Sequence, residues 1–204
     1  MATDAVVHLI DDDEGVRQAV AFLLTTSGFA VRVYESAVAF LSALPSMQPG
    51  CVVTDVRMPG MDGLALQREL KARGIPVPVV VMTGHGDVPL AVEAMKAGAV
   101  DFIEKPFNDE SLLSAIRVAI DRHARDTRRG EEIAEIKERL ASLSPREREV
   151  LDGLIAGLPN KTIAYDLKIS ARTVEVHRAN LMTRMGAHSV ADLVRMVFVV
   201  GAKG

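Results

Sequence analysis

The first 122 residues repeat one pattern five times: a short apolar segment is followed by a segment with apolar residues at helical spacing. Short apolar runs closed by turn residues are typical of strands buried on both faces of a parallel sheet. Single helices between such strands form crossover connections. The pattern predicts an α/β domain, a five-stranded parallel sheet between two helix layers. The predicted strands cover residues 6–10, 29–34, 52–55, 77–82 and 100–103, and the helices 14–26, 37–44, 64–72, 88–97 and a last one from 109.

Polar residues stand directly at the ends of four of these predicted strands. Asp11 and Asp12 follow the first strand, Asp55 ends the third, Thr83 follows the fourth and Lys105 follows the fifth. Because all strands of a parallel sheet end at the same edge, we expect these side chains to converge although they are far apart in the sequence. The turn residues of the segment MPGMDG, which follows shortly after Asp55, end its strand and lead into the next helix.

This set of side chains points to phosphoryl chemistry. Three carboxylates at one edge would repel each other and raise the pKa of at least one of them. A divalent cation removes the conflict, and hard oxygen ligands favour Mg²⁺ over Zn²⁺, for which the sequence has no His and Cys cluster. A carboxylate beside a Lys and a Thr hydroxyl can attack phosphorus and form an aspartyl phosphate. The alternative is that residues 11–13 only cap a helix N-terminus, where acids are favoured.

Four motifs in this region resemble the receiver domain of two-component response regulators. They are LIDDDEGVR, VVTDVRMPGMDG, VVMTGHGD and DFIEKPF, and the resemblance covers residues 5–122. It implies a flavodoxin/CheY-like fold in which Asp55 is the phosphoacceptor. It also implies a Mg²⁺ site formed by Asp11, Asp12, Asp55 and the main-chain carbonyl of Arg57.

The same resemblance implies roles for three further residues. Thr83 would be the switch hydroxyl, Phe102 the aromatic side chain that moves inward, and Lys105 the phosphate ligand, with a cis peptide bond before Pro106. From the sequence alone, Phe102 is equally well explained as a core aromatic residue on a strand. The third acid of the run, Asp13, has no role in this pattern.

The charge distribution divides the chain into two parts. Residues 1–123 carry 10 Lys and Arg against 16 Asp and Glu, whereas residues 144–204 carry 9 against 6. An acidic first half and a basic second half predict two modules, the second with a polyanionic partner. We place a receiver domain at residues 1–122, a charged linker at 123–141 and a helical domain at 142–204.

The sequence also predicts the cellular compartment. No apolar run is long enough to span a bilayer, and the N-terminus MATDAVVHLIDDD has neither a basic region nor a cleavage site. The single cysteine, Cys51, excludes an internal disulfide and is expected to be a small buried residue beside a strand. We therefore expect a cytoplasmic protein without membrane contact.

The linker and the helical domain carry clear helix signals. Ile133, Ile136 and Leu140 have helical spacing in the linker, although Gly130 could interrupt a helix there and a disordered tether is the alternative. The segment SPRE, residues 144–147, combines an N-cap Ser, a Pro at the first position and the Glu of a capping box. Further helix caps are expected at Asn160, Ser170 and Ser189. Two short helices joined by a tight turn form a helix-turn-helix.

The third helix of this domain has an outer face suited to DNA. Its inner face is apolar, while its outer face mixes small, apolar and hydrogen-bonding groups. Arg can recognise guanine, Asn adenine, and Val or Thr the thymine methyl group, while basic residues nearby suit phosphate contacts. A plain helical packing domain is the alternative. The predicted DNA contacts are Asn160, Lys161, Arg172, Thr173, Val176, His177, Arg178, Asn180 and Thr183, with Arg184 as a further phosphate contact.

The second half resembles the four-helix, LuxR-type DNA-binding domain of the NarL/FixJ branch of response regulators. The resemblance covers residues 140–200, around LSPREREVLDGLIAGLPNKTIAYDLKISARTVEVHRANLMTRMG. It implies a transcription factor that a FixL-like sensor histidine kinase phosphorylates. It also implies a monomer that dimerises on phosphorylation, binds double-stranded promoter DNA, works with RNA polymerase and activates nitrogen-fixation or micro-oxic genes. Two alternatives stand beside it: a Mg²⁺-dependent phosphatase that forms an aspartyl phosphate, and a receiver whose helical domain binds protein or RNA.

Overall fold

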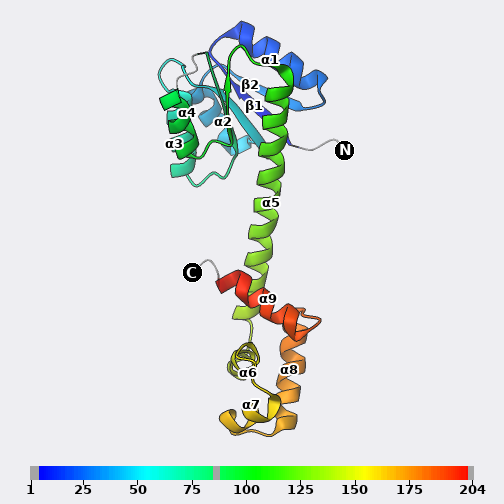
Figure 1. Ribbon diagram of the computed structural model, residues 1–204. Coiled ribbons are helices and arrows are strands. Elements are labelled where there is room, and N and C mark those ends of the chain that lie inside the picture. The colour runs from blue at the N-terminus through cyan, green and yellow to red at the C-terminus, as the bar shows by residue number, and fades with distance from the viewer. Residues whose placement is uncertain (1–4, 85–87, 202–204) are drawn as a thin grey trace. The chain divides into compact units, whose positions relative to one another are not determined.

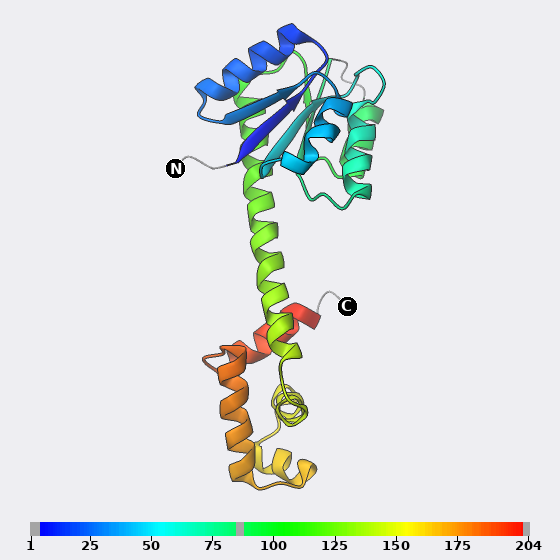
Figure 2. The ribbon, with the colours of Figure 1, turned by 180° about the vertical axis from the view of Figure 1, so that it is seen from behind.

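The computed structural model describes residues 5–84 and 88–201. Residues 85–87, which belong to the VVMTGHGD motif, lie outside the described residues, as do the first four and the last three. The chain divides into two compact units, residues 1–125 and residues 126–204, and each is described by itself. Figures 1 and 2 show the chain from opposite sides.

The first unit contains a parallel sheet with the strand order β2-β1-β3-β4-β5. All neighbouring strands are parallel because each strand returns to the same edge through a helix. β1, β3 and β4 are buried along their whole length, which explains why most of their residues are apolar. The predicted α/β fold is confirmed. The strands are β1 Val6–Ile10, β2 Ala30–Tyr34, β3 Gly50–Asp55, β4 Val79–Thr83 and β5 Asp101–Glu104.

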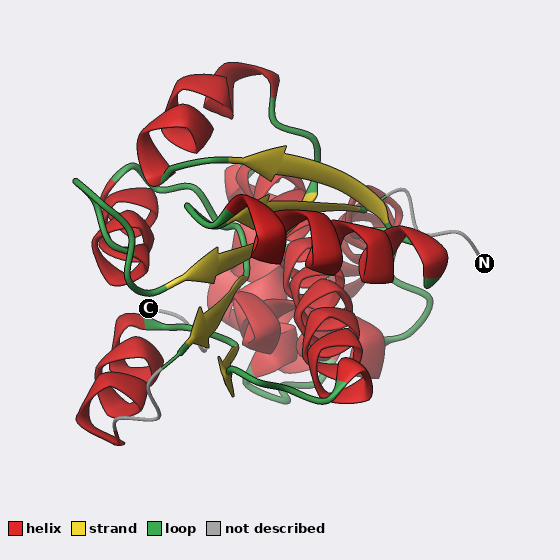
Figure 3. Ribbon diagram, turned by 90° about the horizontal axis from the view of Figure 1, so that it is seen from above, coloured by secondary structure: helices red, strands yellow, loops and turns green. Residues whose placement is uncertain are grey.

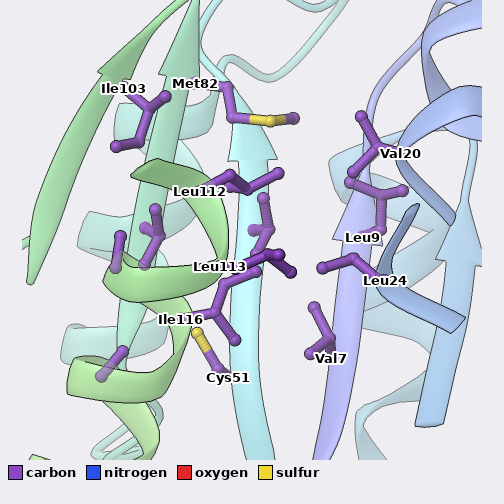
Figure 4. Packing of buried hydrophobic residues seen from close by; sticks show 14 of the residues in the cluster. Val7, Leu9, Val20, Leu24, Cys51, Met82, Ile103, Leu112, Leu113 and Ile116 are labelled. Carbon is purple, nitrogen blue, oxygen red and sulfur yellow. The ribbon is translucent and has the colours of Figure 1, made fainter. Parts of the chain in front are cut away.

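Helices cover both faces of this sheet (Figure 3). On one face, side chains of α1 and of the first half of α5 form a core cluster with the strands, and the buried thiol of Cys51 belongs to it (Figure 4). On the other face, a second cluster joins the strands to α2, α3 and α4. The helices are α1 Glu14–Thr26, α2 Ala37–Ala43 with the 3₁₀ turn η1 Leu44–Ser46, α3 Gly63–Ala72, α4 Val88–Ala97 and α5 Asp109–Ala141.

Several of these helices begin at a side chain that accepts a hydrogen bond from the first turn. Ser36 caps α2, and Asp62 caps α3. Asp13 caps α1, because its carboxylate accepts from the N–H of Val16 at 3.0 Å. A capping side chain typically stabilises a helix by about 1 kcal/mol. The third acid of the DDD run therefore has a structural role.

The last helix of the first unit, α5, runs without interruption from Asp109 to Ala141. Gly130 lies inside it and does not break it. A Gly in a helix interior lowers helix stability by about 1 kcal/mol relative to Ala. This loss is small compared with the stabilisation from the packing of both ends of α5. The first part supplies Leu112 and Ile116 to the core of the first unit, and the last part supplies Ile136 to the core of the second.

The second unit adds four helices that surround one core. The capping box at the start of α6 is complete, since the Ser144 hydroxyl accepts from the Glu147 N–H and Glu147 accepts from the Ser144 N–H. The predicted cap of α7 is wrong: Pro159 is the N-cap, and Asn160 is already helical and makes no capping bond. The helices are α6 Pro145–Ile155, α7 Asn160–Leu167, α8 Ala171–Met185 and α9 Val190–Gly201.

A tight turn joins α7 to α8 and completes the predicted helix-turn-helix. Lys168 ends α7 in the left-handed conformation, with φ at 55°, and Ser170 caps α8 by accepting from the N–H of Thr173. The core that these helices enclose contains Val174 and Leu181 of α8. Among the helices that the structure describes, none is long and apolar enough to cross a membrane.

Candidate functional site

Four polar residues meet at the carboxyl edge of the sheet, each from a different strand. Asp11 follows β1, Asp55 ends β3, Thr83 ends β4 and Lys105 follows β5. The side chains of Asp11, Asp55 and Thr83 are buried, with relative exposures of 1%, 7% and 1%. The parallel topology brings these residues together, as expected for strands that all end at one edge.

Lys105 connects the two buried carboxylates. Its ammonium donates to Asp11 Oδ2 at 2.6 Å and to Asp55 Oδ1 at 2.7 Å. Its main-chain N–H donates to the carbonyl oxygen of Thr83 at 2.6 Å, and its peptide bond to Pro106 is cis. One cation therefore balances two carboxylates at a poorly hydrated edge, where an unpaired charge would be strongly unfavourable.

The loop after β3 holds the second oxygen of Asp55. The N–H of Arg57 donates to Asp55 Oδ2 at 2.6 Å. Gly63, the first residue of α3, donates its N–H to the carbonyl oxygen of Val56 at 2.9 Å, and a Cβ at Gly63 would collide with the main-chain oxygen of Asp55. Only a glycine allows α3 to begin this close to the end of β3. This steric requirement explains the glycine that ends the MPGMDG segment.

The other acids of the DDD run have different surroundings. Asp12 is exposed, and Asp13, which caps α1, also donates its N–H to Asp11 Oδ1 at 3.0 Å. Arg17 donates to the main-chain oxygens of Asp11 and Asp12 at 2.7 and 2.9 Å. Our sequence analysis did not single out Arg17, and its only signal was a basic residue in the helix that follows an acidic run.

The oxygen atoms at this edge have the chemistry that Mg²⁺ requires. Asp11 and Asp55 present buried carboxylates, the ligand type that hard divalent cations prefer, and Asp12 is their exposed neighbour. In the arrangement with Lys105 between Asp11 and Asp55, no three His, Cys, Asp or Glu side chains within the described ranges are grouped closely enough to hold a metal ion. The residue types therefore fit Mg²⁺, and Lys105 occupies the centre of the cluster.

Burial and pairing act in opposite directions on the ionisation of the site. Burial raises the pKa of Asp55 above its ordinary value, although the hydrogen bond and the charge of Lys105 act to lower it. Burial acts to lower the pKa of Lys105, but its hydrogen bonds to Asp11 and Asp55 outweigh this effect and raise the pKa. Lys105 is therefore a permanent cation, and Asp55 is more basic than an exposed Asp, which suits a nucleophile.

An open groove of about 590 Å³ lies beside Lys105. One wall comes from α1, with Phe22 and Leu23, and the other from the segment after β5, with Pro106 and Phe107. Phe22 is exposed although it is large and apolar. The groove is therefore an apolar surface that reaches the edge of the carboxylate cluster.

Two further surfaces adjoin the sheet on the side of α4. Phe102, on β5, is half-buried and packs against the core cluster beneath α2, α3 and α4. On α4 itself, three apolar side chains are exposed: Val88, Val92 and Met95. Phe102 lies on the strand that follows α4, and the structure brings it to the same side of the sheet as this exposed apolar row.

The outer face of α8 lies open to solvent in the second unit. Val174 and Leu181, on the inner face, are buried. Thr173 is half-buried and its hydroxyl is within 2.7 Å of the Ser170 hydroxyl. The predicted contacts His177, Arg178 and Asn160 are also half-buried, while the exposed ones are Lys161, Arg172, Val176, Asn180 and Thr183.

Arg184 has a different environment from the one expected for a phosphate contact. Its Nε lies 3.2 Å from Glu147 Oε1, and its guanidinium donates to the carbonyl oxygen of Ser142 at 3.3 Å. Hydrogen bonds from the main chain and side chain of Ser144 lower the pKa of Glu147, and the charges of Arg184 and His177 add to this effect. Arg184 therefore joins α8 to α6 within the unit.

Two family models match this chain. Residues 7–117 match the response regulator receiver domain, and residues 141–197 match the bacterial regulatory proteins of the luxR family. The chain is a response regulator. The receiver match includes all four residues of the carboxylate edge, and the luxR match includes α7 and α8. The resemblance found in the sequence is confirmed, and the response regulator is a transcription regulator with a helix-turn-helix output.

Named relatives cover nearly the whole response regulator. The transcriptional regulatory protein FixJ of Azorhizobium caulinodans is 57% identical over 96% of this chain and 92% of that protein. FixJ of Rhizobium meliloti is 54% identical over 98% of both chains. Among solved structures, the response regulator StyR is 41% identical and covers 96% of this chain and 99% of its own, with a TM-score of 0.85. Full-length FixJ of B. japonicum is 52% identical over 98% of both chains, with a TM-score of 0.63.

Proposed function

We propose that this response regulator binds promoter DNA under the control of a phosphoryl group on Asp55. The observation that carries the proposal is the environment of this carboxylate. Asp55 is buried at the end of β3, with one oxygen 2.7 Å from the Lys105 ammonium and the other 2.6 Å from the Arg57 N–H. A nucleophilic carboxylate with a cation at its side is suited to accept a phosphoryl group.

The phosphoryl donor is the phosphohistidine of a sensor kinase. An oxygen of Asp55 attacks phosphorus; the O–P bond forms while the P–N bond breaks, and its electron pair stays on the imidazole. The Lys105 ammonium then moves from the carboxylates to a phosphoryl oxygen, and the Thr83 hydroxyl hydrogen-bonds to another. Asp11, Asp12, Asp55 and the main-chain carbonyl of Arg57 would hold Mg²⁺, which would supply positive charge that reduces the repulsion between carboxylates and phosphoryl oxygens.

The groove beside Lys105 is the surface on which the kinase docks. It ends at the residue that contacts Asp55, and its walls carry the exposed Phe22 and Pro106 and the half-buried Phe107. An apolar partner helix placed there brings its histidine near the phosphoacceptor. The FixJ relatives support a FixL-like kinase as the donor.

Phosphorylation is transmitted to α4 and β5. The Thr83 hydroxyl moves toward the phosphoryl group. This movement leaves a space, and the Phe102 ring turns into it. The altered surface of α4 and β5, with its exposed Val88, Val92 and Met95, then pairs with a second copy. A single strong charge contact is enough to shift a two-state element whose states differ by a few kcal/mol.

The dimer presents two copies of α8 to a two-fold-related DNA site. Arg172, Val176, Asn180 and Thr183 enter the major groove, while Lys161 and its basic neighbours contact phosphates. Similarity to FixJ proteins supports the proposal that the DNA targets are promoters of nitrogen-fixation or micro-oxic genes. It also supports RNA polymerase as a partner at these promoters. The response regulator is a phosphoacceptor in this scheme and has no substrate turnover of its own beyond slow loss of the phosphate.

Replacing Asp55 tests the scheme on the full-length protein. Wild type treated with acetyl phosphate and Mg²⁺ first enriches duplexes from a random-sequence pool, and a gel shift then measures binding to them. We expect the phosphodonor to strengthen wild-type binding roughly tenfold. Asp55→Asn keeps the size of the side chain but cannot form an acyl phosphate, so this gain should be absent.

The matched control is an acid in the same loop. Asp62→Asn retains an oxygen that accepts from the N–H of Ala65, as Asp62 does at 2.6 Å, and should respond to acetyl phosphate like wild type. A full phosphodonor response in Asp55→Asn would remove Asp55 from the role of phosphoacceptor. Turnover of small phosphate esters by wild type would instead support a phosphatase.

A further inference from the structure

The last turns of α5 are built into the core of the helical unit. Ile136 is only 6% exposed and belongs to the core cluster that contains Val150, Leu181 and Met185. Leu140 packs against the same cluster from its border. This segment was expected to be a charged linker, but its apolar residues are part of the fold that presents α8.

Arg139, in the last turn of α5, holds the C-terminal end of α8. Its guanidinium donates to the carbonyl oxygen of Met185, the last residue of α8, at 2.7 Å. The same guanidinium lies 2.6 Å from Glu135 Oε1, one turn earlier in α5, which fixes its direction. A cation at a helix C-terminus is doubly favourable, because it satisfies a carbonyl without a helical partner and meets the negative end of the helix dipole.

Gly186 makes this approach sterically feasible. It follows α8 in the left-handed conformation, with φ at 66°, and a Cβ there would lie 2.5 Å from a guanidinium nitrogen of Arg139. A glycine at this position therefore serves two requirements, the backbone conformation that ends α8 and the close contact with Arg139.

A second contact joins the same two segments in the opposite direction. Arg184, the residue before the end of α8, donates to the carbonyl oxygen of Ser142 just after α5. The ends of α5 and α8 are therefore connected by two hydrogen bonds from guanidinium groups. Arg148 of α6 adds a third cation at the end of α5, where it donates to the carbonyl oxygen of Leu140 at 2.8 Å.

We propose that Arg139 is a positioning residue for DNA recognition, which sets the orientation of α8 from its far end. The proposal rests on the proposed DNA binding of α8. Arg172 is 13 residues from Met185, which corresponds to about 20 Å along a helix at 1.5 Å per residue. Arg139 is thus remote from Arg172, which would read bases near the start of α8, whereas Asn180 and Thr183 lie closer to Met185. Its effect on DNA binding passes through the orientation of the helix.

The test compares two arginines of the helical unit in the full-length, acetyl phosphate-treated protein. Arg139→Met keeps the aliphatic stem and removes the bond to Met185. Arg146→Met is the control, because Arg146 is exposed on α6 and, among the described residues, its guanidinium pairs only with Glu149, at 2.8 Å. Both variants lose one positive charge. Affinities are measured for a duplex enriched by wild type from a random pool and for a scrambled duplex of the same composition.

The ratio of these two affinities separates positioning from general electrostatics. We expect Arg139→Met to bind the enriched duplex about tenfold more weakly than Arg146→Met, the effect of losing part of one charge-assisted hydrogen bond. Both variants should bind the scrambled duplex equally. Amide hydrogen exchange of Gly186 and Ala187 should be faster in Arg139→Met only. The proposal would be overturned if the ratio of the two affinities were equal in both variants. It would also be overturned if Arg139→Met lost the same affinity for the enriched and the scrambled duplex.

Two milder variants decide the matter if Arg139→Met does not fold. Arg139→Lys keeps the cation but cannot contact Met185 and Glu135 with one planar group, and Glu135→Gln removes the partner that orients Arg139. Each should lower the affinity ratio by roughly two- to threefold, and an unchanged ratio in both would refute the positioning role. If wild type enriches no duplex at all, the proposed DNA binding fails and this inference fails with it; enrichment without an Arg139 effect removes only the inference.

Discussion

Three consecutive aspartates, residues 11 to 13, have three different surroundings. Asp11 is buried against the Lys105 ammonium, Asp12 is exposed, and Asp13 accepts the Val16 N–H at the start of α1. The chemistry of the side chain is the same in all three cases. Its position relative to the end of β1 and the start of α1 decides which one becomes part of the carboxylate cluster and which one stabilises a helix.

A buried histidine in β1 predicts a pH-dependent stability. The His8 side chain is fully buried; its Nε2 donates to the carbonyl oxygen of Gln48 at 3.0 Å. Burial lowers the pKa of His8 below its ordinary 6.5, the charge of Arg32 acts in the same direction, and the Gln48 hydrogen bond opposes it. The unfolded chain therefore binds the proton more readily than the folded one. The contribution of neutral His8 to the free energy of unfolding is fully present above about pH 6.5. It should be lost as the pH decreases toward the lowered pKa.

Urea unfolding of the full-length protein at about pH 7.5 and about pH 5.5 measures this effect. His8→Val removes the titrating group, so the variant should lose less stability between these two pH values than wild type. An identical loss in His8→Val would assign the pH dependence to other groups.

At the scale of elements, α4 contributes few fully buried side chains to the receiver unit. Ala94 is the one fully buried residue among those described for α4. The ion pair between Arg68 of α3 and Glu93 of α4 is exposed and contributes little. Gln67 of α3 is only 4% exposed, its Oε1 has no hydrogen-bond partner among the described residues, and it borders a cavity of about 220 Å³. An element held this loosely is suited to move during a switch.

The unpartnered oxygen of Gln67 predicts a stabilising substitution. Leu has nearly the same shape and needs no hydrogen bond, so Gln67→Leu should raise the free energy of unfolding of the receiver unit by about 1 kcal/mol. Urea unfolding of the full-length protein provides the measurement. Gln18→Leu is the control, because Gln18 is exposed on α1 and its amide donates to Glu14 at 3.0 Å; it should be nearly neutral. Unchanged or lower stability in Gln67→Leu would show that the amide finds a partner, such as a water.

For the whole molecule, the proposed activation depends on the exposed apolar row of α4. Val92 is 46% exposed on this helix, and a charge there is expected to block apposition of two receivers. Val92→Asp should abolish acetyl phosphate-dependent dimerisation in sedimentation velocity, while intact mass shows normal phosphoryl uptake. Val38→Asp is the control, since Val38 is also an exposed valine but lies on α2. Dimerisation of Val92→Asp to the wild-type extent would place the interface elsewhere.

The sequence by itself determined most of the fold and the identity of the candidate site. Apolar runs indicated the strands of the sheet because most residues of a strand buried on both faces are apolar. Local signals placed the caps at Ser144 and Ser170, since a cap involves only residues three positions apart. Asp55 and Lys105 could be named because they stand at strand ends, and the topology of a parallel sheet makes strand ends meet.

The tertiary structure alone decided what these groups contact. Lys105 bridges Asp11 and Asp55, Arg184 is directed to Glu147 rather than left free for a phosphate, and Arg139 of the expected linker holds the end of α8. Periodicity shows which face of a helix is apolar, but not which carbonyl or carboxylate a long cationic side chain will meet. Such contacts link segments distant in the chain, and their geometry exists only once the elements have packed.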